Sequence, residues 1–252
     1  MFAYASLGSG SKGNATLVRV GDELHLIDVG FPLKEIESRL AALGVSLDDL
    51  SRIWISHEHI DHVRGLGPVA RRSKVPVHLT PGSFRGLKDQ KLPWIDWVEP
   101  DAPLCFGALE VAPFTVPHDA NQPCQYRFSF QGKAFSVLTD VGHITPHVAS
   151  VTGHSNAILI EFNHDPTMLA EGPYPFHLQE RIRNGMGHLC NVSAANFLSH
   201  ANRVSQVSLG HLSESNNCSK MVRELAEQTV DHQCRVDVLS QAVPSAWAEI
   251  YA

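Results

Sequence analysis

The residues His57, His59, Asp61 and His62 form a HxHxDH pattern directly after the apolar run 53–55. An apolar run of this kind is typical of a strand that ends at the edge of a sheet. Because alternate residues of an extended chain point to the same side, we expect the first two histidines to bind one metal ion. The aspartate and the last histidine follow after the chain has turned, so we expect them to face a second ion.

The donor types in this pattern indicate an open hydrolytic site. Imidazole suits zinc, iron and manganese, and a carboxylate adds the harder oxygen that a second divalent ion accepts. No cysteine lies nearby to form a closed structural zinc site. The alternative is a cluster of surface histidines without a metal.

A paired metal site needs further ligands, and three residues elsewhere also end apolar runs: His118, Asp140 and His211. We therefore predict that His57, His59 and His118 bind the first ion, that Asp61, His62 and His211 bind the second, and that Asp140 bridges the two. These seven ligands leave room for a bridging hydroxide that acts as the nucleophile. For each of the two added histidines the alternative is a hydrogen-bonded histidine at a sheet edge, and for the aspartate it is a helix N-cap.

The elements that must position these residues follow from the hydrophobic pattern. Short apolar strands alternate with amphipathic helices, which predicts an α/β fold of two sheets with helices on both outer faces, an αββα sandwich. The expected elements are a hairpin at 17–28, helices at 33–43 and 63–72, a strand at 75–79, strands within 104–139, a loop at 166–176, helices at 177–184 and 193–201, a strand at 204–209, a helix at 214–229 and a strand at 235–239. At 252 residues the chain is expected to form one domain over 1–252.

Composition excludes several classes of protein. No apolar run approaches the roughly 20 residues of a membrane span, and no secretory signal is expected at the start, so we expect a cytoplasmic protein. The five cysteines are widely spaced and form no CxxC pair, so we expect them to be reduced and mostly buried. The net charge of −6 repels phosphate, so a nucleic-acid partner would need a local basic patch.

The order of these motifs resembles the metallo-β-lactamase superfamily. Three further segments, 6–14, 161–165 and 211–217, together with Gly187-His188, look like the YycJ/WalJ family of bacterial enzymes. This resemblance covers nearly the whole chain. It implies a metallo-β-lactamase-type αββα hydrolase with two divalent ions, Zn²⁺ or Mn²⁺ with Fe as a further option, and a 5′ to 3′ exonuclease that acts on DNA in connection with mismatch repair.

The resemblance also implies roles for residues outside the HxHxDH pattern. Asp28 resembles the superfamily carboxylate that orients the metal loop. Glu161 and His188 resemble the glutamate and histidine that shuttle a proton in the related tRNA 3′-processing endonuclease, so we expect His188 to protonate the leaving oxygen. The alternatives are an exposed strand-end carboxylate and a packing histidine. His164 is a weaker candidate, which would contact the substrate, support a ligand or bind Asp165.

Two groups of residues are candidates for substrate binding. The loop 8–14 holds three glycines and two serines whose N–H groups could cradle a phosphate, and Ser9 and Asn14 are the residues to test. A plain turn between strands is the alternative. Trp94 and Trp97 are candidate surfaces on which bases could stack. The candidate cations for binding the nucleic-acid backbone are Arg64, Arg71, Arg72, Lys74, Arg85, Lys88 and Lys91. The alternative for any one of these cations is solvated charge on the back of a helix.

Three classes of function remain open from the sequence. A phosphodiesterase or nuclease is favoured because an aspartate follows HxH and because Glu161 and His188 resemble a proton shuttle. Hydrolysis of a small ester, thioester or lactone is the alternative, and a metal-binding protein without catalysis is the third. The native metal, the oligomeric state, the polarity of cleavage and exo- or endonuclease action are not specified by these residue types.

Overall fold

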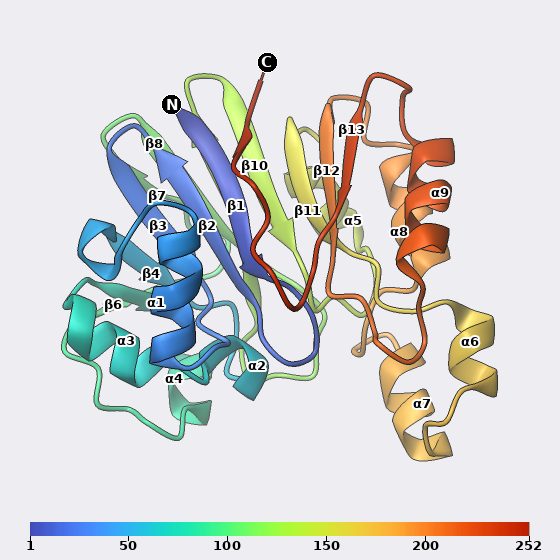
Figure 1. Cartoon of the computed structure of the whole chain (residues 1–252), viewed down its shortest axis with the longest axis horizontal. Helices are drawn as coiled ribbons and strands as arrows, with labels where there is room; N and C mark the ends of the chain where they lie inside the picture. Colours follow the sequence, from blue (N-terminus) through green and yellow to red (C-terminus); the bar gives the residue numbers. More distant parts are fainter. Residues whose placement is uncertain (252) are drawn as a thin grey trace. The chain divides into compact units, whose positions relative to one another are not determined.

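The computed structural model describes residues 1–251, which divide into two compact units. Unit 1 contains residues 1–102, 120–124 and 239–250, and unit 2 contains 103–119, 125–238 and Tyr251. The colours of Figure 1 follow the sequence of both units from the N-terminus in blue to the C-terminus in red. The expectation of one domain over 1–252 stays a prediction.

Unit 1 is built on a seven-stranded mixed sheet with the order β14-β1-β2-β3-β4-β5-β6. The strands are β1 (Phe2–Gly8), β2 (Ala15–Val20), β3 (Glu23–Ile27), β4 (Arg52–Trp54), β5 (Val77–Leu79), β6 (Ile95–Trp97) and β14 (Ala248–Glu249). The pairs from β14 to β3 are antiparallel, and those from β3 to β6 are parallel. The predicted hairpin at 17–28 is confirmed as the pair β2 and β3.

The helices of unit 1 pack an apolar face against this sheet. They are α1 (Leu33–Ala42), the 3-10 turn η1 (Leu47–Asp49), α2 (Ile60–Val63), α3 (Leu66–Ser73) and α4 (Pro81–Gly86). Ile36 and Leu40 of α1 share one buried core with Leu26, Ile53 and Val77 of the strands. Strand residues alternate between the two faces of a sheet, so the residues next to Leu26, Ile53 and Val77 in the sequence point to the opposite face.

Unit 2 is built on a second seven-stranded mixed sheet, with the order β13-β12-β11-β10-β9-β8-β7. The strands are β7 (Leu104–Phe106), β8 (Leu109–Thr115), β9 (Cys124–Phe130), β10 (Lys133–Leu138), β11 (Ala157–Glu161), β12 (Gln206–Gly210) and β13 (Arg235–Val238). The neighbours from β10 to β13 are parallel, and the pairs β7/β8 and β9/β10 are antiparallel. Parallel neighbours end at the same edge, so their following loops meet there.

The helices of unit 2 are α5 (Pro146–Thr152), α6 (Pro166–Glu171), α7 (Phe176–Arg183), α8 (Asn191–Leu198) and α9 (Ser219–Thr229). Of these, α8 and α9 pack on the parallel strands. Phe197 of α8 and Val222 of α9 share a buried core with Ile158, Ile160 and Leu209 of the strands. Figure 1 shows α8 and α9 side by side at this sheet.

Several predicted elements differ from the structure: α9 begins at Ser219 and not at 214, and two further differences have a local physical reason. The helix expected at 63–72 is divided into α2 and α3 at Gly65, whose N–H donates to Val29 O at 2.9 Å and where a Cβ would lie 2.0 Å from Phe31 O. The loop expected at 166–176 contains α6, because the Asp165 carboxylate caps the N–H groups of Thr167 and Met168, each at 2.9 Å.

Two expectations from composition can be compared with residues 1–251. No helix in this described part is long and apolar enough to cross a membrane. Of the five cysteines only Cys124 is buried, so the expectation that most of them are buried is wrong. Hydrophobic thiols were expected inside, but Cys105 and Cys218 lie on exposed positions of unit 2.

Candidate metal centre

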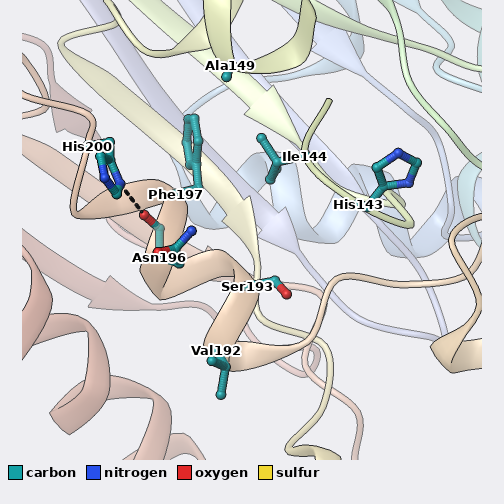
Figure 2. Close-up of a pocket in the computed structure, with 8 residues that line it drawn as sticks. All are labelled: His143, Ile144, Ala149, Val192, Ser193, Asn196, Phe197 and His200. Carbon is teal, nitrogen blue, oxygen red and sulfur yellow. Dashed lines mark hydrogen bonds between the residues drawn. The ribbon is translucent and has the colours of Figure 1, made fainter. Parts of the chain in front are cut away.

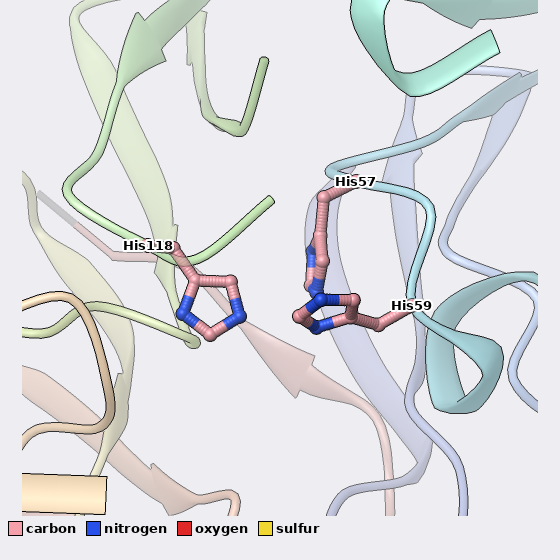
Figure 3. Close-up of side chains that lie close together, drawn as sticks. All are labelled: His57, His59 and His118. Carbon is pink, nitrogen blue, oxygen red and sulfur yellow. The ribbon is translucent and has the colours of Figure 1, made fainter. Parts of the chain in front are cut away.

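In unit 1, His57 and His59 lie between β4 and α2, and Asp61 and His62 lie within α2 itself. His57 and His62 are buried, and Asp61 is partly exposed. The ring of His57 meets that of His59 edge to face with centroids 4.5 Å apart, and the ring of His62 lies 4.2 Å from it. Figure 3 shows the first two rings, together with His118 of unit 2. Three imidazoles of one short loop are therefore gathered at one place.

Asp28 fixes the orientation of this loop. It has a left-handed backbone, with φ 59°, directly after β3. Its Oδ2 accepts a hydrogen bond from His62 Nδ1 at 2.7 Å, and its Oδ1 accepts one from Ser56 N at 2.8 Å. The proton of His62 is thus held on Nδ1, so the lone pair of Nε2 is available to a metal ion.

Ser56 links the Asp28 carboxylate to His57, the first histidine of the HxHxDH pattern. Its hydroxyl donates to Asp28 Oδ2 at 2.8 Å and accepts from His57 Nδ1 at 3.0 Å. His57 therefore also carries its proton on Nδ1 and presents Nε2 as a donor atom. One buried carboxylate selects the tautomer of two histidines, directly for His62 and through a hydroxyl for His57.

The glycine-rich loop of unit 1 lies against these ligands. The Asn14 amide nitrogen is 3.1 Å from His62 Nε2 and 3.4 Å from Asp61 Oδ2, and its carbonyl accepts from Gly10 N at 2.9 Å and from Ser9 Oγ at 3.3 Å. The backbone N–H groups of six loop residues donate to protein acceptors: Gly8, Ser9, Gly10, Lys12, Gly13 and Asn14. These bonds favour the plain-turn interpretation of the loop over a phosphate cradle, and substrate binding by Ser9 and Asn14 stays a prediction.

A second cluster of ligand-type residues lies in unit 2, at the ends of its strands. Asp140, Glu161, His188 and His211 each offer a donor atom within 4.8 Å of the others. His118 belongs to the same cluster, because its Nε2 lies 3.8 Å from Asp140 Oδ1. The parallel strands β10, β11 and β12 end at Leu138, Glu161 and Gly210, which explains why residues far apart in the sequence meet here.

The tautomers in this cluster leave lone pairs that face one another. His118 Nδ1 is 3.1 Å from Gly187 O and His211 Nδ1 is 2.8 Å from Glu161 Oε1, so both histidines carry their proton on Nδ1. Their Nε2 atoms then face Asp140 Oδ1 at 3.8 and 3.5 Å. Two imidazole lone pairs beside one carboxylate oxygen suit divalent cations, so the donor set fits metal ions.

Asp140 and His211 both have left-handed backbones, with φ 55° and 54°. The alternative of a helix N-cap for Asp140 is wrong, because α5 begins later and is capped by Thr145. A left-handed conformation is unfavourable for a histidine, so the contacts of the surrounding structure must stabilise His211 in it.

Glu161 is fully buried and accepts four hydrogen bonds. Its Oε1 accepts from His188 Nδ1 and His211 Nδ1, each at 2.8 Å, and its Oε2 accepts from Val141 N at 3.1 Å and Leu189 N at 3.0 Å. Burial alone would raise the pKa of Glu161, but the charge of His188 and the bonds from both histidines lower it to about 2. The alternative of an exposed strand-end carboxylate is therefore wrong.

His188 is the more accessible partner of this pair, with its side chain 24% exposed. Burial lowers its pKa, but the charge of Glu161 and the hydrogen bond to it outweigh burial, so the pKa is raised above its usual value. A protonated imidazole that is partly open to solvent can donate a proton to a substrate.

His164 is buried behind this cluster. Its Nδ1 is 3.2 Å from Asn163 Oδ1, and Asn163 Nδ2 donates to His211 O at 3.0 Å. Burial lowers the pKa of His164 to about 4, so the ring is neutral at pH 7. These contacts are those of a residue that supports a ligand, and a role in substrate binding stays a prediction.

Sequence reasoning missed two residues that hold the ligands, Ser56 and Asn163. A serine directly before an HxH pattern and an asparagine before His164 were visible signals. Their importance depends on Asp28 and His211, which lie 28 and 48 residues away in the sequence.

Comparison with known proteins agrees with this geometry. A family model described as the metallo-beta-lactamase superfamily matches residues 8–152. The chain belongs to the metallo-β-lactamase superfamily.

Individual relatives resemble this chain over most of its length. Exodeoxyribonuclease WalJ of Streptococcus pneumoniae is 34% identical over 240 residues, which cover 92% of this chain and 88% of that protein. Exodeoxyribonuclease YycJ of Bacillus anthracis is 31% identical over 241 residues, which cover 91% of this chain and 89% of that protein. The resemblance to the YycJ/WalJ family inferred from the motifs is thus confirmed.

The fold prediction is also confirmed. The metallo-beta-lactamase fold protein YhfI from Bacillus subtilis superimposes with a TM-score of 0.75 and 16% identity, and the match covers 97% of this chain and 99% of that protein. Two mixed sheets with helices, as expected from the alternating pattern, are the core of this fold.

Proposed function

We propose that this protein is a metal-dependent hydrolase that cleaves phosphodiester bonds in DNA, as a 5′ to 3′ exonuclease. The observation that carries the proposal is the 34% identity, over 92% of the chain, to a protein named an exodeoxyribonuclease. The intact set of ligand-type residues in both units supports it. A role in DNA repair and a cytoplasmic location belong to the same proposal.

The proposed metal ligands are those predicted from the sequence. His57, His59 and His118 would hold one divalent ion, Asp61, His62 and His211 would hold the other, and Asp140 would be shared, with Zn²⁺ or Mn²⁺ as the metals. Two bound cations would activate a water molecule and neutralise the charge that develops on phosphorus. The buried hydrogen bonds that four histidines donate from Nδ1 support this assignment, because they leave Nε2 as the donor atom for a metal. The acceptors are Asp28, Ser56, Glu161 and the carbonyl of Gly187.

Residues of the chain supply orientation and a proton. The Asp61 carboxylate would accept a hydrogen bond from the attacking water and turn its lone pair toward phosphorus. His188 would donate the proton of its Nε2 to the leaving oxygen, since its Nδ1 is held by Glu161 at 2.8 Å. Glu161 touches no substrate in this scheme because it is fully buried. It keeps His188 protonated and His211 oriented.

The proposal is tested with metal-stripped protein that is refilled with Mn²⁺ or Zn²⁺. Single-stranded and duplex DNA, labelled at either the 5′ or the 3′ end, serve as substrates. We expect metal-dependent release of the 5′ label first, as short products, while the 3′ label stays on fragments that shorten with time. Metal analysis of the refilled protein is expected to give two ions per chain.

Asp61→Ala is expected to abolish this cleavage and to lower the metal content. His232→Ala is the matched control, because the His232 side chain is 85% exposed and belongs to neither cluster. Absence of DNA cleavage with either metal, together with turnover of a thioester or lactone, would replace the proposal by a small-molecule hydrolase.

A further inference from the structure

A pocket of unit 1 opens directly beside His59. It has a volume of about 260 Å³ and is lined by Glu58 and His59, by one side of α2 and α3, and by the segment 86–89. Small-ligand pockets usually measure about 300–1,000 Å³. This pocket lies just below that range, so it can take one part of a nucleotide, such as its sugar or base, and it begins at a proposed metal ligand.

Two cations of the pocket are available to a phosphate. Arg64 and Lys88 both line it and both are exposed. Within residues 1–251 neither has a carboxylate at ion-pair distance. Two neighbouring arginines, in contrast, are already neutralised, since Arg71 binds Asp89 at 2.9 Å and Arg72 binds Asp48 at 3.0 Å.

The acidic residues of the pocket do not cancel these two charges. Asp89 is held by Arg71 and accepts the N–H of Lys91 at 3.1 Å. Glu58 Oε1 accepts the N–H of Asn121 at 2.9 Å, a neutral donor that leaves the negative charge of Glu58 in place. The two positive charges of Arg64 and Lys88 exceed this one negative charge, so the balance in the pocket is positive in a protein whose net charge is −6.

An apolar side chain completes the pocket. Ile60 lies in its lining and is 54% exposed, although it is large and apolar. Val63 and Leu87 also line the pocket. Cations beside an exposed aliphatic surface match the two halves of a nucleotide, since the phosphate binds the cations and the sugar or base packs on the aliphatic side chain.

A larger pocket in unit 2 lacks these properties. It has a volume of about 520 Å³ and is lined by His143, Ile144, Asn196, Phe197 and His200 among others, as Figure 2 shows. It contains no lysine, no arginine and no residue of the metal-ligand clusters. It therefore offers no fixed positive charge to a phosphate.

We infer that the pocket of Ile60, Arg64 and Lys88 binds the nucleotide that adjoins the cleaved phosphodiester. The phosphate of this nucleotide binds Arg64 and Lys88, and its sugar or base packs on Ile60. The inference rests on the proposed function and specifies where the DNA strand is held. It also supplies the local basic patch that an acidic protein needs to bind DNA.

The test compares the double variant Arg64→Gln/Lys88→Gln with Lys34→Gln/Arg203→Gln. Both remove two positive charges from exposed positions, but only the first changes the pocket. Binding of a fluorescent single-stranded oligonucleotide to metal-stripped protein is measured by anisotropy at several salt concentrations. Without metal, cleavage does not disturb the binding equilibrium.

We expect the pocket variant to raise Kd at least tenfold at low salt and the control variant to leave it within twofold. Each lost phosphate contact on a single strand reduces the slope of log K against log salt by about 0.7. The slope of the pocket variant is therefore expected to be shallower by about 1.4. An unchanged Kd and slope in the pocket variant would overturn the inference.

A second measurement separates the inference from the proposed function. Bis(p-nitrophenyl) phosphate has one phosphate and no neighbouring nucleotide, so the metal-loaded pocket variant is expected to hydrolyse it at the wild-type rate while its KM for DNA rises. A wild-type protein that hydrolyses neither substrate overturns the proposed function. Equal loss of both activities in the pocket variant overturns the inference, because the two cations would then act at the reacting phosphate itself.

Discussion

His188 and Glu161 form a residue pair in which a partly exposed proton donor is held next to a buried carboxylate. Burial opposes both shifts, but the attraction between the two charges, together with their hydrogen bond of 2.8 Å, raises the pKa of His188 and lowers the pKa of Glu161. Such a pair is suited to protonate an alkoxide that leaves from phosphorus.

His188→Ala is expected to lower kcat for DNA by roughly 10²- to 10⁴-fold, the usual contribution of a general acid. A p-nitrophenolate leaving group needs no proton, so the same variant is expected to keep most of its activity on bis(p-nitrophenyl) phosphate. Steady-state kinetics on both substrates check this. An equal loss on both would mean that His188 holds the site together and does not donate the proton.

Ser56 is a second residue whose role is testable. Ser56→Ala removes the hydroxyl that connects Asp28 to His57, so the tautomer of His57 is no longer fixed. We expect metal affinity to fall about 10- to 100-fold, as for other residues that orient metal ligands. Competition with a chromophoric chelator measures this affinity.

Ser136→Ala is the control for this change. The Ser136 hydroxyl is also fully buried and hydrogen-bonded, to Ser155 Oγ at 2.8 Å, but it contacts no ligand. It is expected to destabilise the fold by about 1 kcal/mol without changing metal affinity. Equal metal affinity in Ser56→Ala and wild type would contradict the proposed relay.

At the scale of elements, the ligand loop is positioned by backbone contacts that tie three segments of unit 1 together. Asn14 N donates to Asp61 O at 2.8 Å, Gly30 N donates to Asn14 O at 2.9 Å, and Val29 N donates to His62 O at 2.7 Å. Backbone hydrogen bonds therefore join the glycine-rich loop, the segment after β3 and the start of α2.

Gly30 is the position where this arrangement leaves no room for a side chain. A Cβ there would lie 1.8 Å from Asp61 O and 2.4 Å from Asn14 N, and both are backbone atoms that cannot rotate away. Gly30→Ala is expected to lower the free energy of unfolding by more than about 4 kcal/mol, in the exceptional range for a point substitution. Urea unfolding measures this.

Gly21→Ala separates crowding from backbone strain. Gly21 has φ +60° but nothing within 4 Å of its Cβ position. Its replacement is expected to cost only about 1–2 kcal/mol, the price of a left-handed L-residue. Similar losses for the two variants would show that crowding at Gly30 is relieved by a small shift.

At the scale of the whole molecule, buried histidines make the free energy of unfolding depend on pH. In unit 1, His25 and His78 lie on either side of Trp54, which stacks on His78 with ring centroids 4.0 Å apart and donates to His25 Nδ1 at 3.2 Å. Burial, together with the charge of Arg52, lowers the pKa of His25 to about 3. Burial also lowers the pKa of His78 to about 4, against the charge of Asp96.

Both pKa values are lower in the folded than in the unfolded state, where histidine titrates near 6.5. The unfolded state therefore binds more protons below this value, and stability falls as pH falls. Between pH 7 and pH 5 each histidine is expected to remove about 2 kcal/mol. The loss is complete only when the pH reaches the folded pKa values of about 3 and 4.

His78→Phe keeps an aromatic ring against Trp54 but cannot be protonated. Urea unfolding of metal-free protein at both pH values is expected to show a loss about 2 kcal/mol smaller than in wild type. His200→Gln, at an exposed position, is expected to leave the pH dependence unchanged. A His78→Phe variant with the wild-type pH dependence would contradict this account.

The fold and the ligand-type residues could be predicted because their signals are local. The HxHxDH pattern, the apolar runs that end in His118, Asp140 and His211, and the alternation of strands and helices each lie within a few neighbouring residues. Ser56 as a relay and Asn14 as a neighbour of Asp61 could not be predicted, because each depends on a residue brought near by folding. The helix α6 was missed although Asp165-Pro166 is a helix-start signal, since the glycines and prolines that follow suggested a loop.

The left-handed backbones of Asp28, Asp140 and His211 have a consequence for how this protein would change under selection. A non-glycine residue in this conformation is less stable than glycine or asparagine at the same place. A laboratory population selected for heat resistance alone would therefore be expected to gain glycine or asparagine first at Asp140 and His211, and to lose metal as it gained robustness. Selection for heat resistance would therefore have to be combined with a screen for bound metal, so that activity is retained.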